Sequence, residues 1–506
     1  MRKKQIFTNK YILIFPALLV YLLGFYFSYT ELFTVLIKSN QTTLIRNVIE
    51  YGTMYLSLLF FCAWIYKVRF LRIIPYLLLI LLSLNFLISV ICFTIYKSSF
   101  NSGMVLSILD TNAKESLSMS SMFIYPIIFA LLFWVLNIYL AKSISKITFP
   151  RFLILLSFLW IIFPVLFKLK HKFIENKGGG SMIKSVYYHY NDFLIGYNLK
   201  KDLENIKSNH VNYPLKKNRK EISTIVLLIG ESVQPKHMQL YGYERKNTPY
   251  QVKEIKNMRL YRNALSPAGI TNLSVPLMLS SIQPEEFLNN KIKIADNVVN
   301  FAEQKGYETY WMSTQSLSGI ISIIASYSNN RKYFNGYDEV ILPEFYKVLK
   351  NKNKKLIILH LMGSHPNPCD KIPEKEKIYS KNNIIDCYDS SINYTDKIIG
   401  EILNKLRDEN SVFIYASDHG LKIKGDKMLH TDSKESTKVP FYIWFSPKLP
   451  KEVKETGIIE SPVQTIMIYP QIIEFMGYKT NNNYQNLDFK YLNLDLKAID
   501  YSNLKD

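Results

Sequence analysis

The sequence predicts an α-helical transmembrane domain of five helices followed by a soluble domain with an α/β sandwich fold. Residues 1–170 are dominated by apolar stretches of about 20 residues, the length that an α-helix needs to cross a bilayer core of roughly 30 Å. After residue 216, short β-branched runs alternate with amphipathic stretches. This alternation is typical of a largely parallel sheet covered by helices. A chain of 506 residues is also too long for one hydrophobic core.

The predicted membrane spans cover approximately Tyr11–Tyr29, Asn47–Tyr66, Ile73–Tyr96, Met122–Leu140 and Phe152–Phe167. Segments 1–10, 67–72 and 141–151 together hold ten Lys and Arg residues, whereas segments 30–46 and 97–121 hold four. Because basic loops stay on the cytoplasmic side, the N-terminus is predicted to be cytoplasmic and the chain after the fifth span to be exported. The first span follows basic residues without a small-residue cleavage site, so an uncleaved anchor is expected.

Composition sets the predicted domain boundaries. Residues 1–170 carry 16 Lys and Arg against 4 Asp and Glu, a net +12 of the total +21. Residues 171–215 are rich in Lys, Asn and Tyr and are predicted to be a linker with an interfacial helix around Met182–Leu199. Residues 216–506 form the predicted soluble domain. A basic chain can bind nucleic acid, but the neighbouring spans make anionic lipid head groups the expected partner, and no nucleic-acid partner is expected.

The four cysteines fall into two pairs. Cys62 and Cys92 lie in apolar runs and are typical small core residues. Cys369 and Cys387 lie in the soluble part and can form a disulfide if that part is in an oxidising compartment. Two free thiols are the alternative, and the sequence does not decide between them.

The elements of the soluble part are predicted from hydrophobic periodicity. Strands are expected at residues 222–229, 308–312, 356–361, 412–416 and 440–445, and helices at 297–304, 388–406 and 465–476. No dinucleotide or P-loop fingerprint interrupts this alternation.

Carboxylates and an imidazole follow two of these strands. Asp418 and His419 come directly after strand 412–416, and Glu231 follows strand 222–229 within the motif GES. In open α/β sheets ligands bind outside the carboxyl ends of the strands, so these side chains are expected at the same edge. Taken alone, the Asp-His pair is equally well explained as a surface turn.

Thr271 lies in TNLSVP at a predicted helix start, where a hydroxyl either caps the helix or faces an anion bound at its N-terminus. His365 follows strand 356–361, and His430 comes eleven residues after His419. Two carboxylates, one imidazole and one hydroxyl form a tetrahedral oxygen and nitrogen set suited to zinc. Such a cation would lower the pKa of the hydroxyl and make the otherwise weak threonine nucleophile reactive.

A polar segment also lies in the second exported loop. Residues 109–118 read LDTNAKESLS and include Thr111 and Glu115 close to the expected membrane surface. They form either a solvated loop with a helix cap or a polar contact for a lipid head group.

The motif order resembles a known family. A membrane anchor followed by GES, TNxSxP, GSH, SDHG and a later histidine is similar to the phosphoethanolamine transferases of the Gram-negative inner membrane, of the lipid A and lipopolysaccharide-core type. These belong to the alkaline phosphatase/sulfatase superfamily, whose fold the resemblance implies for the soluble domain. The similarity extends over nearly the whole chain, including the five spans and the DTNAKE loop.

The resemblance also implies residue roles. Glu231, Thr271, Asp418 and His419 match the ligands of at least one Zn²⁺ ion, and Thr271 matches the nucleophile that carries phosphoethanolamine. The further matches are substrate-phosphate or second-zinc residues at His365 and His430, and polar residues of the membrane-side loop at Thr111 and Glu115.

The chain departs from the family pattern in two places. Members commonly have cysteines flanking the nucleophile, where this chain has Pro267 and Leu277. Members also commonly have Glu after SDHG, where this chain has Leu421. The predicted metal ligands are intact, whereas the extra rigidity that flanking disulfides give to the nucleophile loop is not expected.

The implied protein is a monomeric, multi-pass enzyme of the bacterial inner membrane with a periplasmic catalytic domain. Its expected donor is phosphatidylethanolamine, and its expected acceptor is lipid A, lipopolysaccharide core or another envelope glycan. Two alternatives stay open. One is a phosphoglycerol transferase of the lipoteichoic acid synthase kind, which shares the five spans and the threonine. The other is an inactive sensor that binds envelope glycans. A sulfatase is disfavoured because the chain lacks the C/S-x-P-x-R motif.

Overall fold

The computed structural model describes residues 14–28, 41–96, 99–111, 113–147, 150, 152, 154–159, 182–208, 211, 217, 220–315, 319–379, 383–425, 427–479 and 489–505. These residues belong to two compact units. The first contains the described residues of Met1–Asn101 and Leu117–Leu194, and the second those of Ser102–Ser116 and Ile195–Asp506. The segment 102–116 therefore belongs to the second unit, although in the sequence it lies between helices of the first.

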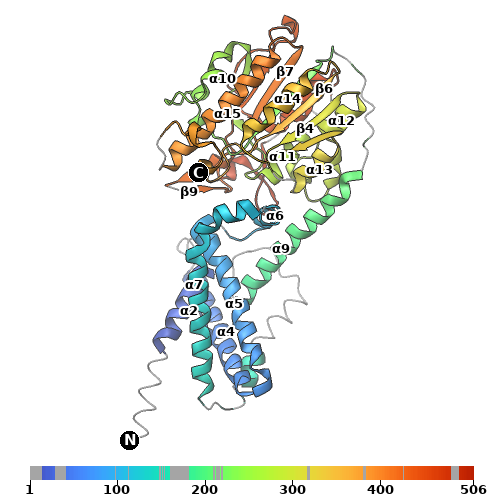
Figure 1. Ribbon diagram of the computed structural model, residues 1–506. Coiled ribbons are helices and arrows are strands. Elements are labelled where there is room, and N and C mark those ends of the chain that lie inside the picture. Colours follow the sequence, from blue (N-terminus) through green and yellow to red (C-terminus); the bar gives the residue numbers. More distant parts are fainter. Residues whose placement is uncertain are drawn as a thin grey trace. The chain divides into compact units, whose positions relative to one another are not determined.

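The elements before residue 210 are helices (Figure 1): α2 (Ile14–Ser28), α4 (Gln41–Lys67), α5 (Ile73–Ile91), α6 (Ser102–Asp110), α7 (Ala113–Ser145) and α9 (Met182–Glu204). Two described stretches, Arg69–Tyr96 and Ser120–Ser145, are helical, long and apolar enough to cross a membrane. They coincide with the third and fourth predicted spans. The second predicted span lies within α4. The first lies partly, and the fifth largely, outside the described residues, so the number five stays a prediction.

The first unit has a largely apolar interior that also contains polar groups, and its surface carries large apolar side chains. Tyr55 donates a hydrogen bond of 2.8 Å to Asn137 in its buried interior. The exposed positions of α5 and α7 are instead occupied by large apolar side chains such as Leu77, Leu81 and Leu132. Water would penalise such a surface, whereas lipid hydrocarbon would not. This distribution agrees with the prediction that these helices are membrane spans.

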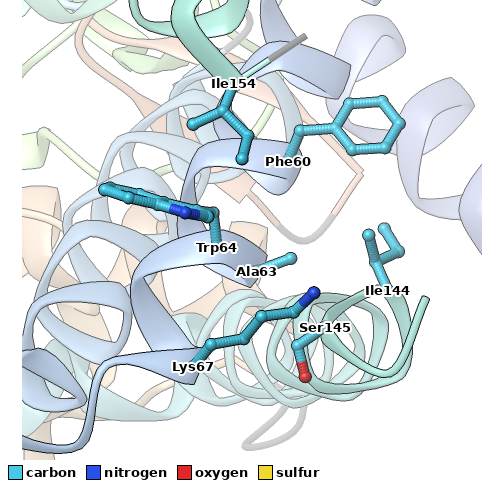
Figure 2. A pocket seen from close by; sticks show the side chains of 7 residues that line it. All are labelled: Phe60, Ala63, Trp64, Lys67, Ile144, Ser145 and Ile154. Carbon is cyan, nitrogen blue, oxygen red and sulfur yellow. The ribbon is translucent and has the colours of Figure 1, made fainter. Parts of the chain in front are cut away.

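A small cavity of the first unit is shown in Figure 2. Its walls are the apolar side chains of Phe60, Trp64, Ile144 and Ile154, and the Lys67 ammonium group donates nearby to a backbone carbonyl. None of the predicted catalytic or metal-binding residues lines it.

The second unit is built on an eight-stranded sheet with the order β11-β2-β10-β7-β1-β6-β4-β5. The strands are β1 (Thr224–Gly230), β2 (Met258–Tyr261), β4 (Glu308–Ser313), β5 (Asn330–Tyr333), β6 (Lys355–His360), β7 (Ser411–Ser417), β10 (Phe441–Phe445) and β11 (Gly457–Ile459). The five strands from β7 to β5 are parallel, as predicted. β10 is antiparallel to both its neighbours, so the sheet is mixed.

Short two-stranded pairs lie beside this sheet: β3 (Ala264–Leu265) with β12 (Val463–Gln464), β8 (Lys422–Lys424) with β9 (Lys427–Leu429), and β13 (Lys490–Leu492) with β14 (Ala498–Asp500). The helices are α10 (Pro249–Lys253), α11 (Thr271–Leu279), α12 (Val298–Gln304), α13 (Gly319–Ser326), α14 (Leu342–Leu349), α15 (Ile384–Leu406), α16 (Lys434–Thr437) and α17 (Ile468–Phe475).

Helices cover both faces of the sheet (Figure 1). Alternate residues of β1 point to opposite faces, so Ile225 and Leu227 join the core with α11, α12, α13 and α17, while Val226 and Leu228 join the core with α14 and α15. The predicted apolar face of α15, which includes Ile399 and Leu403, packs in the second core. The predicted α/β sandwich is therefore confirmed.

Cys369 and Cys387 form a disulfide. The bond joins the loop after β6, four residues beyond His365, to the first turn of α15. Cys62 and Cys92 are buried free thiols, as predicted.

Candidate active site

Glu231 follows the last residue of β1 and is fully buried. The next residue, Ser232, has a positive φ of 62°, which is strained for a residue with a side chain. Three contacts hold it: its N–H donates to Asp418 Oδ1 at 3.1 Å, its carbonyl accepts from Tyr388 at 2.7 Å, and its hydroxyl donates to Glu231. The sharp turn that carries Glu231 is thus fixed from three sides.

The loop after β6 packs against this turn. Gly363 has a φ of +51°, and a Cβ there would lie 3.0 Å from the Glu231 backbone nitrogen. The buried Asp338 carboxylate accepts from the N–H groups of Met362 and Gly363, both at 2.9 Å. Glycine is therefore required by both the backbone conformation and the close approach. This explains the glycine of the GSH motif that precedes His365.

Asp418 and His419 lie at the end of β7, next to β1, and both are fully buried. The His419 N–H donates to Asp418 Oδ1 at 2.7 Å, and His419 Nδ1 lies 2.8 Å from the carbonyl of Gly420. A carbonyl only accepts, so Nδ1 carries a proton, and Nε2 is the ring nitrogen that faces the two carboxylates and, when deprotonated, offers a lone pair to a cation. Nε2 lies 3.3 Å from Asp418 Oδ2 and 3.4 Å from Glu231 Oε1.

Thr271 is the first residue of α11, as the predicted helix start requires. Its Oγ1 lies 3.0 Å from Glu231 Oε2 and 3.2 Å from His419 Nε2. The structure therefore brings together all four side chains that the sequence predicted as one site, from three separate chain segments. The hydroxyl also lies at the positive end of the α11 dipole, which favours a developing negative charge.

His430 and His365 lie beside this cluster. The His430 ring is 4.8 Å from that of His419 between centroids, and 6.0 Å from that of His365. One ligand atom each of Glu231, His419 and His430 lies within 4.8 Å of the others, a spacing compatible with a metal site. His430 is partly exposed, whereas Glu231 and His419 are buried. The sequence had assigned His430 to substrate phosphate or a second zinc, and its position allows either role.

The two carboxylates have opposite pKa shifts. Burial opposes the ionisation of Glu231, but His419, His365 and the Ser232 hydroxyl together hold its pKa below the usual range. Burial and the neighbouring Glu231 charge raise the pKa of Asp418 to about 7. Burial also lowers the pKa of His430, which therefore stays uncharged near neutral pH. Two buried carboxylates side by side are the environment that a cation would relieve.

The donor set fits zinc by its chemistry and by its unsatisfied atoms. Within the described part of the chain, Asp418 Oδ2 and His430 Nε2 are buried and have no hydrogen-bond partner. Buried polar atoms usually have one, and a bound ion is one reason for an exception. Oxygen and imidazole nitrogen donors arranged around a hydroxyl match the ligands that zinc prefers.

Sequence reasoning missed Gln315. This residue follows β4, and its side-chain amide donates to Glu231 Oε2 at 3.0 Å and to the Leu361 carbonyl at 2.8 Å. It fixes the same carboxylate oxygen that contacts Thr271. Its position just beyond a parallel strand was the available signal, but a neutral amide in a polar loop carries no ligand signature.

The two predicted membrane-side residues are placed differently. Thr111 follows α6, and its hydroxyl donates to the Ser107 carbonyl at 2.7 Å, which agrees with the helix-cap alternative. No hydrogen bond joins it to Glu231, Thr271, Asp418 or His419 among the residues described. The side chain of Glu115 lies outside the described part of the structure.

A mixed α/β sandwich with acid, imidazole and hydroxyl groups at the carboxyl edge of its parallel strands defines an enzyme of the alkaline phosphatase/sulfatase class. Residues 223–478 match the Sulfatase family, and residues 6–187 match the family described as Transferase YhbX N-terminal domain. The chain is 31% identical over 435 residues to "Putative transferase YhbX" of Escherichia coli (strain K12), which covers 80% of each chain. It is 27% identical to "Phosphoethanolamine transferase EptA" of Helicobacter pylori, covering 76% of this chain and 78% of the relative.

These matches show that the chain belongs to the sulfatase family, in its group of YhbX-, EptA- and EptC-type phosphoethanolamine transferase homologues. Solved structures agree in fold. The integral membrane protein EptA of Neisseria meningitidis has a TM-score of 0.61 at 18% identity and covers 96% of this chain and 99% of its own. The C-terminal periplasmic domain of Escherichia coli EptC, solved as a complex with Zn, has a TM-score of 0.52 at 21% identity, covering 58% and 98%. The predicted family resemblance is confirmed.

Proposed function

We propose that this enzyme transfers phosphoethanolamine from phosphatidylethanolamine to lipid A, lipopolysaccharide core or another envelope glycan, with Thr271 as the nucleophile. The observation that carries the proposal is the position of Thr271 Oγ1, within 3.2 Å of both Glu231 and His419. The named activity of relatives such as "Phosphoethanolamine transferase OpgE", 28% identical over 54% of this chain and 58% of its own, supports the substrate class.

Glu231, Thr271, Asp418 and His419 would hold a zinc ion, which supplies a positive charge that lowers the pKa of the threonine hydroxyl. The Thr271 hydroxyl donates to Glu231 at 3.0 Å and lies 3.2 Å from His419 Nε2, and its place at the start of α11 sets its direction. His419 keeps this orientation because its Nδ1 proton is donated to Gly420. Orientation of this kind removes much of the entropic part of the barrier.

The reaction would take two displacements. In the first, the Thr271 hydroxyl gives up its proton to solvent and Oγ1 forms a bond to phosphorus, the bond from phosphorus to the diacylglycerol oxygen breaks, and His365 protonates the departing alkoxide. This leaves phosphoethanolamine as a diester on Thr271. In the second, a phosphate or hydroxyl oxygen of the acceptor attacks phosphorus and Thr271 leaves. The uncharged His430 is suited to accept the proton of an acceptor hydroxyl.

The proposed location is the inner membrane, with the N-terminus in the cytoplasm and the catalytic unit in the periplasm. The distribution of Lys and Arg around the predicted spans supports this orientation. The Cys369–Cys387 disulfide supports an oxidising compartment.

Mass spectrometry of the purified full-length protein, incubated with phosphatidylethanolamine, tests the mechanism. We expect phosphoethanolamine on Thr271 in the wild type, less of it in Thr271→Ser, and none in Thr271→Ala, with transfer lowered at least about a thousandfold in the alanine variant. Thr395→Ser, a buried threonine of α15, is the matched control and should keep full activity. Undiminished transfer by Thr271→Ala would overturn the nucleophile assignment.

The donor test separates the main alternative. Phosphatidylglycerol offered at the same concentration should give no modified Thr271, whereas a phosphoglycerol transferase would prefer it. The names of the relatives favour phosphatidylethanolamine. An inactive sensor would give neither adduct and no bound zinc. Mass spectrometry of lipids and glycans from cells with and without the gene then identifies the acceptor.

A further inference from the structure

The helix α6 is part of the core of the second unit, which contains the candidate active site and is called the catalytic unit below. In the sequence it lies between Arg69–Tyr96 and Ser120–Ser145, the two described stretches able to cross a membrane. Nevertheless Leu106 is fully buried in the same hydrophobic core as Leu199, Leu494 and Leu496. The neighbouring Ile108 is 64% exposed. One face of α6 is therefore docked onto the catalytic unit.

The docking partner is the C-terminal segment 490–496, which contains β13. The Gly103 N–H donates to the Leu494 carbonyl at 2.8 Å. A Cβ at residue 103 would lie 2.9 Å from that same carbonyl oxygen, so glycine permits the approach. On its other side, α6 accepts a hydrogen bond from Lys200 of α9 at the Leu109 carbonyl, at 2.8 Å. α6 thus has fixed partners at both ends.

The C-terminal segment also holds the loop that leads to Thr271. The Leu492 N–H donates to the Pro267 carbonyl at 2.8 Å, and Leu492 forms a parallel bridge with Ala268. The Tyr491 hydroxyl lies 2.6 Å from where a Cβ of Gly269 would be. These contacts fix the three residues 267–269, which directly precede the start of α11. A disulfide flanking the nucleophile is absent here, and this packing supplies the restraint instead.

The same segment holds the loop that carries His430. Asp432 accepts from the Tyr491 hydroxyl at 3.0 Å and from the Leu494 N–H at 3.1 Å. Burial, followed by the Asp432 charge, raises the pKa of Tyr491 well above its usual value, so the phenol stays protonated and donates. The Leu494 backbone therefore links α6 to Asp432. Its N–H donates to Asp432, and its carbonyl accepts from the Gly103 N–H.

We propose that Asp432 is a positioning residue for Thr271 and His430. In this proposal α6 holds the C-terminal segment 490–496 against Asp432, so the active site depends on the segment 102–110. Docking of α6 orders the two loops that supply the nucleophile and the partly exposed histidine. It also presents Thr111, the predicted membrane-side substrate residue, from the catalytic unit itself. This inference rests on the proposed function for its catalytic consequence, but not for the structural coupling.

Hydrogen exchange of the full-length protein measures that coupling without any turnover. Leu106→Ala removes the buried anchor of α6, Ile108→Ala removes a similar volume from its exposed face, and Ile399→Ala opens a cavity in the core on the opposite side of the sheet. We expect faster exchange in residues 267–271 and 430–436 for Leu106→Ala only. Faster exchange confined to α6, or the same change in Ile399→Ala, would overturn the coupling.

Activity and zinc affinity test the consequence. Leu106→Ala and Asp432→Ala should each lower kcat by about 10- to 100-fold, since small misplacements of a nucleophile have effects of this size, with little change in KM. Asp432→Asn keeps one acceptor oxygen and should recover part of the loss, which a merely structural role would not require. Zinc affinity, measured against a competing chelator, should weaken with kcat. Unchanged kcat with altered exchange would refute the catalytic role alone. Failure of Thr271→Ala to abolish transfer would instead count against the proposed function.

Discussion

Two buried acidic clusters of the catalytic unit neutralise their charge in different ways. Asp386 and Asp389, on α15, face Arg245, whose Nη1 lies 2.7 Å from an oxygen of each. Asp389 also accepts from Tyr243 at 2.9 Å and contacts His237 at 3.0 Å. This cluster contains its own cation and satisfies its acceptors from side chains of the same unit.

Among the residues that the structure describes, no lysine or arginine forms an ion pair with Glu231 or Asp418. The basic group beside both carboxylates is the His419 imidazole, whose Nε2 lies 3.3 Å from Asp418 Oδ2 and 3.4 Å from Glu231 Oε1, and Asp418 Oδ2 accepts no hydrogen bond within the described chain. As a result the pKa of Asp418 is raised to about 7 by burial and by Glu231. The first cluster is therefore complete as folded, whereas the second lacks a fixed cation of its own, as the proposed zinc site would.

The largest expected effect is the loss of the internal cation. Arg245→Ala leaves two buried carboxylates facing each other and should lower the free energy of unfolding by about 3 kcal/mol, the lower end of the range for a buried pair, because the Arg245 side chain is one-third exposed. Thermal or denaturant unfolding of the purified protein measures it. Arg262→Ala, which removes an exposed pair with Glu460, is the control and should cost at most about 1 kcal/mol. Equal losses in the two variants would contradict the view that the Arg245 cluster is self-contained.

The second effect concerns the external cation. At a zinc concentration about 100 times the Kd, the wild type should gain about 2.7 kcal/mol of stability over chelator-treated protein. Asp418→Asn should lose this gain, yet be more stable than the wild type when both are free of metal, because the repulsion from Glu231 is gone. Asp396→Asn, altered at another buried carboxylate, should keep the zinc response. A metal-free Asp418→Asn protein less stable than the wild type would show that the cluster is neutralised from within.

The part of the candidate site that lies at strand ends could be predicted from the sequence. Glu231, Asp418 and His419 each follow a buried apolar run, and parallel strands bring their carboxyl ends to one edge, so proximity follows from the pattern. Thr271 was predictable from a helix-start motif. The same reasoning identified the five central strands and the apolar face of α15.

Other parts carried no local signal. β10 has the same kind of apolar run as the parallel strands β1, β6 and β7, yet it pairs antiparallel with both β7 and β2. Nothing in residues 102–110 distinguishes a loop between membrane helices from a helix docked in the catalytic core, since Leu106 and Ile108 are both apolar. The pairing of Asp432 with Tyr491 joins residues 59 apart in the sequence. Such contacts depend on tertiary packing rather than periodicity.

A third buried carboxylate, that of Asp396, has neither kind of cation beside it among the described residues. Its hydrogen bonds there come from N–H groups, those of the Tyr250 and Gln251 backbone and the Gln251 side chain, at 2.9–3.0 Å. Burial raises its pKa to about 6 despite these hydrogen bonds. The folded pKa lies above the unfolded value of about 3.9. The stability that Asp396 contributes is therefore full below pH 4 and is lost as the pH rises to 6.

Relative to Asp396→Asn, the wild type should lose about 2 kcal/mol of stability between pH 4 and pH 6.5 and change little above that. Melting temperatures measured in chelator across this range give the difference. Glu303→Gln, at a half-exposed carboxylate of α12, serves as the control and should show no such window. If the wild type instead gained stability relative to Asp396→Asn as the pH rose, the hydrogen bonds would outweigh burial. Asp396 would then resemble the Arg245 cluster.

The smallest effect tests how far the open cluster is preorganised for its cation. The Gln315 amide bridges Glu231 Oε2 and the Leu361 carbonyl, so it holds the carboxylate before any metal arrives. Loss of such an orienting hydrogen bond typically weakens metal affinity by 10- to 100-fold. Gln315→Ala should therefore weaken zinc binding by about tenfold, or about 1.4 kcal/mol, in chelator competition. Gln304→Ala, on α12, should leave the affinity unchanged. If Gln315→Ala bound zinc as tightly as the wild type, the charge of the cluster alone would account for its affinity, and the geometry around Glu231 would be set by the Ser232 turn and Gly363 instead.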